Sequence, residues 1–287
     1  MRTGAASASQ AVRIATTDLE SARVPEPAAS AEVLLSELLG IGRADIALHD
    51  EALSDEQAAL YEAWISRRLQ REPVQRILGY AYFRDLVLDL SVETLIPRPD
   101  TESVVEAALE RVDMRNGPCR VLDVGTGSGA IAISIAHERP SCEVHATDVS
   151  GTVLETARRN AERNGATVHL HRADMASGLD FLNGTVEVLA SNPPYVKTGE
   201  IPKLAPEVRD WDPHTALDGG PDGLAYYRRI FAETPPLLRG GADMILEVGG
   251  GQADAVLELA DRAGFTPLGI RPDLAGTPRA VLVRWER

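Results

Sequence analysis

The sequence predicts an α/β protein in which an open, mainly parallel sheet follows a helical N-terminal segment. From Cys119 onward, short apolar runs typical of strands alternate with longer runs typical of helices, as in sheets built from βαβ units. A glycine-rich turn, residues 125–129, separates the first such strand from the first such helix. Residues 1–78 instead carry apolar residues at helical spacing, which favours a separate helical domain.

Two amphipathic segments dominate the N-terminal part. Residues 28–40 place an alanine and three leucines on one helical face, and glycines follow. Residues 54–72 begin with a capping signature, Ser54 followed three residues later by Gln57, and Pro73 ends the segment. The apolar stripe predicted for this second helix is Leu60, Trp64, Ile65 and Leu69.

A short stretch of different rhythm separates the helical part from the sheet. Residues 82–96 alternate apolar and polar side chains, which predicts a hairpin or two linker strands. We therefore divide the chain into a helical domain (1–78), a β-hairpin linker (79–97) and an α/β domain (98–287).

Composition restricts the class of protein. The chain has 287 residues, of which 44% are hydrophobic and 25% charged, as in globular domains. Its net charge of −14 argues against a protein that grips duplex nucleic acid, because such binding depends on lysines and arginines that neutralise phosphates. We find no bilayer-spanning run, no secretory signal, and no metal or redox spacing of Cys119 and Cys142. These features predict a cytoplasmic protein without metal or membrane partners.

The glycine-rich turn predicts a nucleotide-like cofactor. Gly125, Gly127 and Gly129, with Thr126 and Ser128 between them, allow a tight turn at a helix N-terminus whose N–H groups are unpaired. The second strand ends about twenty residues later, where Asp148 can bind ribose hydroxyls. This pattern serves both nicotinamide enzymes and S-adenosylmethionine enzymes, so it does not decide between them.

The fourth strand, "VEVLASN", ends in an unusual corner, "NPPY", at residues 192–195. Two prolines remove two backbone donors and stop the strand, while Asn192 is held extended because it precedes a proline. Ligands of open α/β sheets bind beyond the carboxyl ends of the strands, and this strand is expected beside the glycine-rich one. The third strand ends at Asp174, and Met175 after it can cover an adenine.

The corner suits methyl transfer to an amide or exocyclic amine nitrogen. Such a nitrogen is a poor nucleophile because its lone pair is conjugated. The side-chain carbonyl of Asn192 and the backbone carbonyl of Pro193 can accept its two N–H bonds, which orients the lone pair and stabilises developing positive charge. Pro194 stiffens the corner, and Tyr195 supplies a flat wall for a planar group. The predicted cofactor is therefore S-adenosyl-L-methionine.

Several longer motifs occur in one order along nearly the whole chain. They are "EPVQRILGYAYFRDLVL", "TLIPRPDTESVVEAAL", "VLDVGTGSGAIAIS", "SNPPYV", "LAPEVRDWDPHTALDGGPDGLAYYRRI", "ILEVGGGQ" and "DLAGTPRAV". In these motifs the sequence resembles the HemK-type protein-(glutamine-N5) methyltransferases, which modify peptide chain release factors. The "IPRPDTE" segment is the most specific, since nucleic-acid amine methyltransferases share the corner but generally lack this segment. The resemblance implies a Rossmann-like seven-stranded methyltransferase domain, preceded by a small helical substrate-recognition domain and a β-hairpin linker.

The resemblance also implies roles for individual residues. It places Gly125–Gly129 against the methionine part of the cofactor, Asp148 on the ribose and Met175 beside the adenine, with Asp174 nearby. It places Asn192–Tyr195 on the substrate glutamine, and it has residues 98–102, beginning with Arg98, line the cofactor side of the cleft. One departure is Asp212 in "DWDP", where the family often has glutamate.

The predicted function is methylation of the glutamine in the Gly-Gly-Gln loop of a release factor, which tunes translation termination, with no stable nucleic-acid binding. Two alternatives remain: a nucleic-acid methyltransferase acting on adenine N6 or guanine N2, and a paralogue methylating another amide. A non-enzymatic cofactor-binding protein is a third. Trp211 and the segment 196–225 have no assigned role, and His169 and His171 are expected to share a strand face rather than to bind metal.

Overall fold

The computed structural model describes residues 6–49, 51–115, 117–273 and 275–287. The chain divides into two compact units. The first comprises Met1–Gly79 together with Ala205–Trp211, and the second comprises Tyr80–Leu204 and Asp212–Arg287. A short piece of the segment that follows the "NPPY" corner therefore belongs to the helical unit, which the sequence did not indicate.

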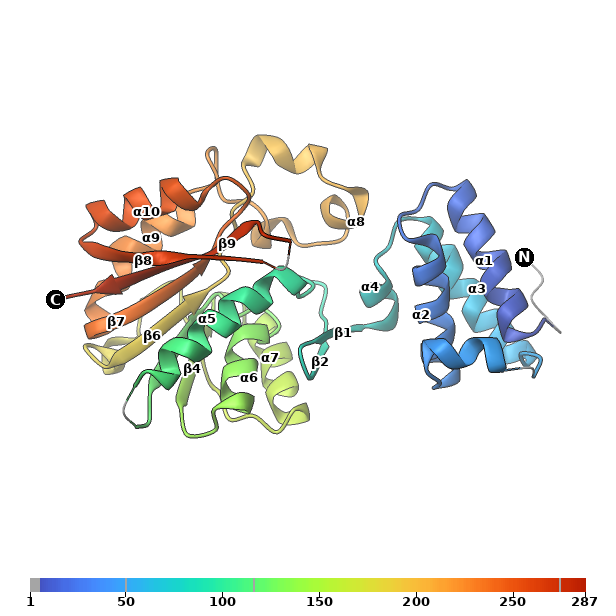
Figure 1. Ribbon diagram of the computed structural model, residues 1–287, viewed down its shortest axis with the longest axis horizontal. Helices are drawn as coiled ribbons and strands as arrows, with labels where there is room; N and C mark the ends of the chain where they lie inside the picture. Colours follow the sequence, from blue (N-terminus) through green and yellow to red (C-terminus); the bar gives the residue numbers. More distant parts are fainter. Residues whose placement is uncertain (1–5, 50, 116, 274) are drawn as a thin grey trace. The chain divides into compact units, whose positions relative to one another are not determined.

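The first unit is helical (Figure 1). Its elements are α1 (Ala8–Ser21), α2 (Pro27–Leu39), the 3-10 helix η1 (Arg43–Leu48), α3 (Asp55–Leu69), α4 (Val74–Leu78) and the short α8 (Pro206–Arg209). The capping box predicted for α3 is present, with both reciprocal bonds between Ser54 and Gln57. Leu34 and Leu35 of α2 are fully buried, as predicted.

The predicted apolar stripe of α3 was wrong at one position. Leu60 is 44% exposed, whereas its neighbour Tyr61 is 1% exposed. The Tyr61 hydroxyl donates a hydrogen bond of 2.9 Å to the carbonyl of Ala31, so its one polar atom is satisfied inside the core. The Tyr61 ring, whose hydroxyl has a buried partner, removes more apolar surface from water than a leucine would. The buried face of α3 therefore includes position 61 instead of position 60.

The second unit contains a seven-stranded sheet of order β5-β4-β3-β6-β7-β9-β8. The first five strands are parallel, and β9 is antiparallel to both β7 and β8. Their bounds are β3 (Arg120–Val124), β4 (Glu143–Asp148), β5 (His169–Arg172), β6 (Val186–Ser191), β7 (Leu238–Glu247), β8 (Phe265–Pro272) and β9 (Pro278–Trp285). The predicted fold class is confirmed, including a hairpin of β1 (Tyr80–Phe83) and β2 (Leu86–Asp89).

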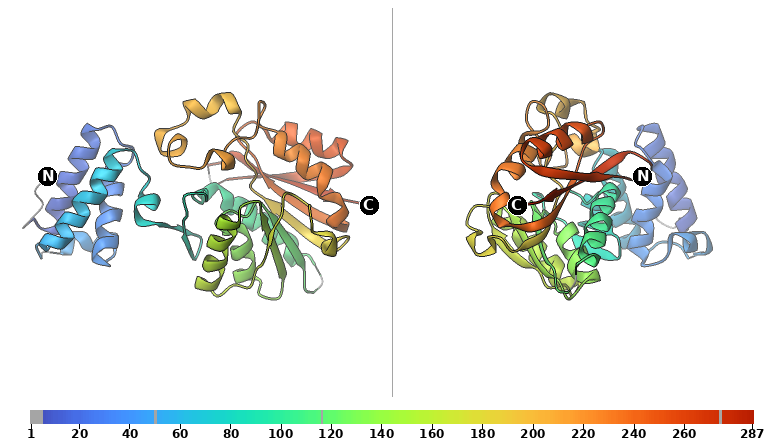
Figure 2. Two further views of the ribbon diagram at one scale, coloured as in Figure 1. Left: turned by 180° about the vertical axis from the view of Figure 1, so that it is seen from behind. Right: turned by 60° about the vertical axis from the view of Figure 1, so that its left-hand side comes forward.

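Helices cover both faces of this sheet (Figures 1 and 2). On one face pack α5 (Glu102–Asp113), α6 (Ala130–Glu138) and α7 (Gly151–Arg163), and on the other α9 (Ala225–Glu233) and α10 (Ala253–Arg262). Successive strand residues serve opposite layers: Val121 belongs to the first core and Leu122 to the second. Short 3-10 turns complete the unit, namely η2 (Pro99–Thr101), η3 (Asp180–Leu182), η4 (Thr198–Lys203), η5 (His214–Ala216) and η6 (Pro235–Leu237).

The parallel strands bring four chain segments to one edge of the sheet. Strand β3 lies between β4 and β6, and β7 lies beyond β6, so their carboxyl ends are neighbours. The glycine-rich turn, Asp148, Asn192 and Glu247 stand at these four ends. Among the described residues, no helix is both long and apolar enough to cross a membrane.

Candidate active site

A cavity of about 620 Å³ opens at this edge of the sheet, within the second unit. Its wall runs from the glycine-rich turn through Asp148 and Met175 to the corner at Asn192–Pro194. The predicted site residues that line it are Arg98, Gly125, Thr126, Gly127, Ser128, Asp148, Asp174, Met175, Asn192, Pro193 and Pro194. The structure thus brings most of the predicted cofactor and substrate residues to one cavity, but Gly129 and Tyr195 are not among its lining residues.

The glycine-rich turn requires its glycines for backbone conformation. Gly125, Gly127 and Gly129 have φ values of +74°, +57° and +90°, in a region that side chains rarely adopt. At Gly129 a Cβ would also lie 2.5 Å from Cδ1 of Ile133. The turn is tied to β4 by the N–H groups of Gly125 and Thr126, which both donate to the carbonyl of Thr147.

Asp148 is held by backbone donors rather than by cations. Its Oδ2 accepts from the N–H of Gly127 at 3.2 Å, and its Oδ1 accepts from the N–H of Ser150 at 3.1 Å. Burial raises the pKa of Asp148, and these N–H bonds oppose the rise. The carboxylate is thereby fixed at the cavity wall, where its remaining lone pairs can accept from vicinal hydroxyls.

Asp123, which the sequence analysis did not single out, lies directly beneath the turn. It is fully buried, and its Oδ2 accepts from the Thr126 hydroxyl at 2.7 Å and from the N–H of Ala132 at 3.3 Å. Its Oδ1 is buried with no hydrogen-bond partner among the described residues. Burial raises the pKa of Asp123 to about 7, so the uncharged acid is readily formed. Asp123 is not among the residues that line the cavity, so its carboxyl supports the turn from within the protein through Thr126 and Ala132.

The wall beyond β5 contains Met175 and Asp174. Met175 is 7% exposed and has a φ of +52°, unusual for a side chain of this size. Asp174 is more exposed and forms an ion pair of 3.0 Å with Arg229, which also lines the cavity. Met175 therefore offers an apolar surface, and Asp174 offers a carboxylate that is already paired.

The "NPPY" corner begins where β6 ends, next to β3 as predicted. Ser191 anchors it, because its hydroxyl donates to the carbonyl of Val124 at 2.6 Å. The amide nitrogen Nδ2 of Asn192 donates to the Thr101 hydroxyl at 3.1 Å. This hydrogen bond therefore fixes the Asn192 amide through its nitrogen atom.

Tyr195 is packed against backbone on two sides. A Cβ on Gly219 would lie 2.8 Å from Cα of Tyr195, and one on Gly249 would lie 2.9 Å from its ring. Nε2 of Gln252 donates to the backbone carbonyl of Tyr195 at 2.9 Å. Burial raises the pKa of Tyr195 to about 12, so the phenol stays neutral. The motif "EVGGGQ" therefore supports the corner through Gln252 and Gly249.

The chain matches two family models. The PrmC N-terminal domain matches residues 10–79, and the methyltransferase small domain matches residues 105–207. A release factor glutamine methyltransferase of Cereibacter sphaeroides is 38% identical over 278 residues, 96% of this chain and 98% of that protein. One from Bradyrhizobium diazoefficiens is 42% identical over 277 residues, covering 93% and 91% of the two chains.

The chain belongs to the release factor glutamine methyltransferase family. A crystal structure of a Pyrococcus furiosus methyltransferase shares the fold, with a TM-score of 0.51 at 19% identity over 79% of this chain and 98% of that one. Membership makes this chain an S-adenosylmethionine-type methyltransferase in fold and class. We refer to the part of the cavity at the glycine-rich turn, where the sequence predicts the cofactor, as the cofactor end, and to the part at Asn192 as the corner end.

The family segment "IPRPDTE" contacts the corner through Thr101, which accepts from Asn192, and contacts neighbouring motifs through three side chains. Arg98 pairs with Asp212, whose side chain is completely buried. Asp100 forms an ion pair of 3.0 Å with Arg279. Thr101 donates to Glu247 at 2.6 Å. The segment was expected to line the cleft, and Arg98 and Thr101 do; it also joins the corner to "DWDP" and "GTPR".

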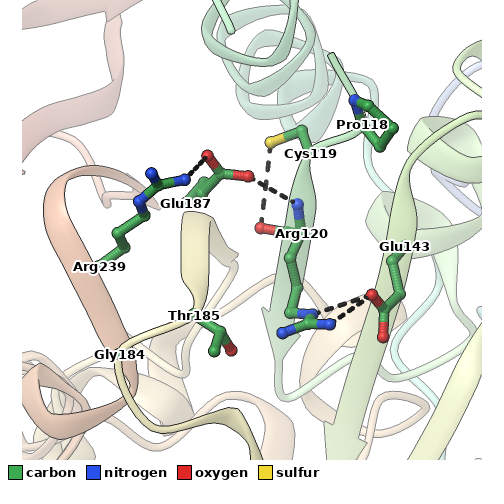
Figure 3. A pocket seen from close by; sticks show the side chains of 8 residues that line it. All are labelled: Pro118, Cys119, Arg120, Glu143, Gly184, Thr185, Glu187 and Arg239. Atoms are coloured by element: carbon green, nitrogen blue, oxygen red, sulfur yellow. Dashed lines mark hydrogen bonds and ion pairs between the residues drawn. The ribbon is translucent and has the colours of Figure 1, made fainter. Parts of the chain in front are cut away.

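A second hollow of about 350 Å³ lies at the opposite, amino edge of the same sheet (Figure 3). Its charged groups are paired with each other: Arg120 with Glu143 at 2.6 Å and Arg239 with Glu187 at 2.9 Å. Burial raises the pKa of the Cys119 thiol, which keeps it a poor nucleophile. The predicted site residues line the other cavity, at the carboxyl edge of the sheet.

The histidines of β4 and β5 stack on one face of the sheet. The ring of His145 lies 5.0 Å from that of His169 and 5.2 Å from that of His171, and Phe181 packs beside them. Among the described residues, no group of three or more His, Cys, Asp or Glu side chains is arranged to hold a metal ion.

Proposed function

We propose that this chain transfers a methyl group from S-adenosyl-L-methionine to the side-chain amide nitrogen of the glutamine in the Gly-Gly-Gln loop of a peptide chain release factor. One observation supports this most strongly. A single cavity joins a turn suited to a nucleoside-bearing cofactor to a corner suited to a planar amide, in a chain that belongs to this family.

The residues of the cofactor end fit S-adenosylmethionine. Residues 125–129 would receive its methionine part, Asp148 its ribose hydroxyls and Met175 its adenine, with Asp174 at the rim. Bound there, the cofactor supplies an electrophilic methyl group on a sulfonium. The carboxylate of Asp148 suits two vicinal hydroxyls because its backbone donors leave lone pairs free.

The residues of the corner end would hold the substrate amide. Oδ1 of Asn192 and the backbone carbonyl of Pro193 would accept its two N–H bonds and turn the nitrogen lone pair toward the methyl group. Both acceptors stabilise the positive charge that develops on the nitrogen. Pro194 and Tyr195 would form the wall, and Arg98 would hold the entrance together with Asp212.

The helical unit would recognise the body of the release factor. The peptide bonds from Tyr195 lead through η4 to Ala205–Trp211, which belongs to that unit. Glu207 fixes this piece, since its carboxylate accepts from Arg71 at 2.6 Å and from the buried Arg68 at 3.1 Å. Trp211 is the last residue of this piece, and we propose no separate role for it. The reaction belongs to translation termination and hence to the cytoplasm.

The test is label transfer. Purified protein, a release factor and methyl-labelled cofactor should give label on the loop glutamine, located by peptide mass spectrometry. A release factor whose loop glutamine is replaced by alanine is the control and should stay unlabelled. Label on another residue, or on added RNA instead, would contradict the proposal.

A further inference from the structure

A buried carboxylate outside the predicted site stands behind the corner. Glu247 ends β7 and has 0% exposure. Its Oε2 accepts from the Thr101 hydroxyl at 2.6 Å, and its Oε1 accepts from the Tyr195 hydroxyl at 3.4 Å. Its backbone carbonyl accepts from Tyr227 at 2.8 Å. A carboxylate is costly to bury, so its placement against two residues that touch the corner requires a reason.

The hydrogen bonds run in one direction. An ionised carboxylate only accepts, so the single hydroxyl proton of Thr101 must point toward Glu247. The Thr101 oxygen then faces Asn192 with lone pairs only and can accept only from Nδ2. The amide of Asn192 cannot flip without placing Oδ1 against that oxygen. Its carbonyl is therefore directed away from Thr101.

We propose that Glu247 is a positioning residue for methyl transfer, which through Thr101 holds the Asn192 amide with its carbonyl toward the substrate nitrogen. This inference rests on the proposed role of Asn192 in the reaction. Glu247 itself is fully buried and is not among the residues that line the cavity. It acts by selecting one of two amide orientations that are equal in shape and opposite in hydrogen bonding.

The ionisation state of Glu247 gives this role a pH signature. The pKa of Glu247 is raised to about 7: burial raises it most and Asp100 adds to the rise, while Thr101, Arg279 and Tyr195 oppose it. A protonated Glu247 can donate to Thr101, whose hydroxyl is then free to turn toward Asn192. The rate of methyl transfer should therefore fall as the pH drops through about 7.

The experiment is a double-mutant cycle under single-turnover conditions with saturating cofactor. Thr101→Val, which removes the hydroxyl at nearly constant shape, should lower the rate constant about tenfold to a hundredfold. Thr101→Ser keeps the hydroxyl and should restore most of it. In the Asn192→Ala background, Thr101→Val should cost less than about threefold, because nothing is left to orient. The cofactor dissociation constant should change less than about twofold in every variant.

Two further variants keep the test independent of folding. Thr234→Val removes another fully buried hydroxyl, bonded to the carbonyl of Ile230 at 2.8 Å and outside the cavity, and should leave the rate unchanged. Glu247→Gln cannot ionise and should give a lower rate without the step near pH 7.

Each outcome has a distinct meaning. Equal losses in Thr101→Val and Thr101→Ser, a full additional loss of Thr101→Val in the Asn192→Ala background, or an unchanged pH step in Glu247→Gln would overturn the positioning role. An Asn192→Ala enzyme with the parent rate would instead overturn the proposed function of the corner. The two failures are thus distinguishable.

Discussion

The two ends of the cavity are built in different ways. At the cofactor end, the backbone determines the geometry: three glycines adopt positive φ, and two N–H groups hold Asp148. At the corner end, side chains from segments far apart in the sequence determine the geometry. Thr101, Asn192 and Glu247 form one chain of hydrogen bonds although up to 146 positions separate them in sequence.

This difference predicts two kinds of mutational effect. A change at the cofactor end should alter affinity for the cofactor, because those groups contact it alike before and during the reaction. A change at the corner end should alter the rate, because its acceptors matter most once the substrate nitrogen becomes cationic. Each substitution below either separates the two ends or shows that they act together.

The largest effect is expected for Asn192→Ala. It removes the acceptor proposed for the reacting amide and should lower the single-turnover rate constant by about two to three decades. Calorimetry should show nearly unchanged cofactor affinity. Asn183→Ala, an exposed asparagine outside the cavity, is the matched control. A normal rate constant with a raised substrate requirement would make Asn192 a docking residue.

Asp148→Ala should give the next largest effect, on binding. The loss of charge-assisted hydrogen bonds to the ribose costs about 1.5–3 kcal/mol, or roughly one to two decades in the cofactor dissociation constant. The N–H groups of Gly127 and Ser150 also lose their acceptor. Asp148→Asn keeps one carbonyl and should lose less. Equal affinity in all three proteins would show that the ribose is held elsewhere.

Features determined by neighbouring residues could be predicted from the sequence. The alternation of strands and helices, the glycine-rich turn with Asp148 after the next strand, and the Ser54–Gln57 capping box each depend on short spacings. The position of β6 beside β3 followed from the general order of such sheets. These features specify the fold and the cofactor end.

Features determined by strand register and long-range contacts could not be predicted. Glu247 and Gln252 stand 52 and 57 positions from Tyr195, and only the order of the sheet brings them to the corner. The buried Asp123 looks in sequence like any other strand acid. Residues 205–211 join the helical unit through Glu207, a contact with arginines more than 130 positions away.

Gly127→Ala tests the backbone part of the cofactor end and should give a smaller effect. Nothing lies within 4 Å of its added Cβ, so only the positive φ of +57° is penalised. A penalty of about 1 kcal/mol should weaken cofactor binding roughly fivefold. Gly165→Ala is matched, with φ of +64° and an open Cβ position, but lies outside the cavity. It should lower the melting temperature similarly and leave affinity unchanged. Similar affinity losses in both variants would contradict a local role of the turn.

The smallest effect is expected for Tyr195→Phe. It keeps the ring that we propose as a wall for the substrate amide, and it removes a hydrogen bond to Glu247 that is long, at 3.4 Å. The rate at pH 8 should fall less than about threefold. Because the Tyr195 hydroxyl lowers the pKa of Glu247, the pH step should move to higher pH in this variant.

Tyr227→Phe supplies the contrast within the same carboxyl end of β7. Its hydroxyl donates at 2.8 Å to the backbone carbonyl of Glu247, and the ring is completely buried. An unsatisfied buried carbonyl should lower the free energy of unfolding by about 1–3 kcal/mol, measured by urea titration. Since it does not touch the Glu247 carboxylate, the pH step should stay in place. If Tyr227→Phe displaced the pH step of the rate and Tyr195→Phe did not, the Glu247 carboxylate would be responding to a general loosening of β7. That result would contradict an ordered chain of side-chain hydrogen bonds at the corner end.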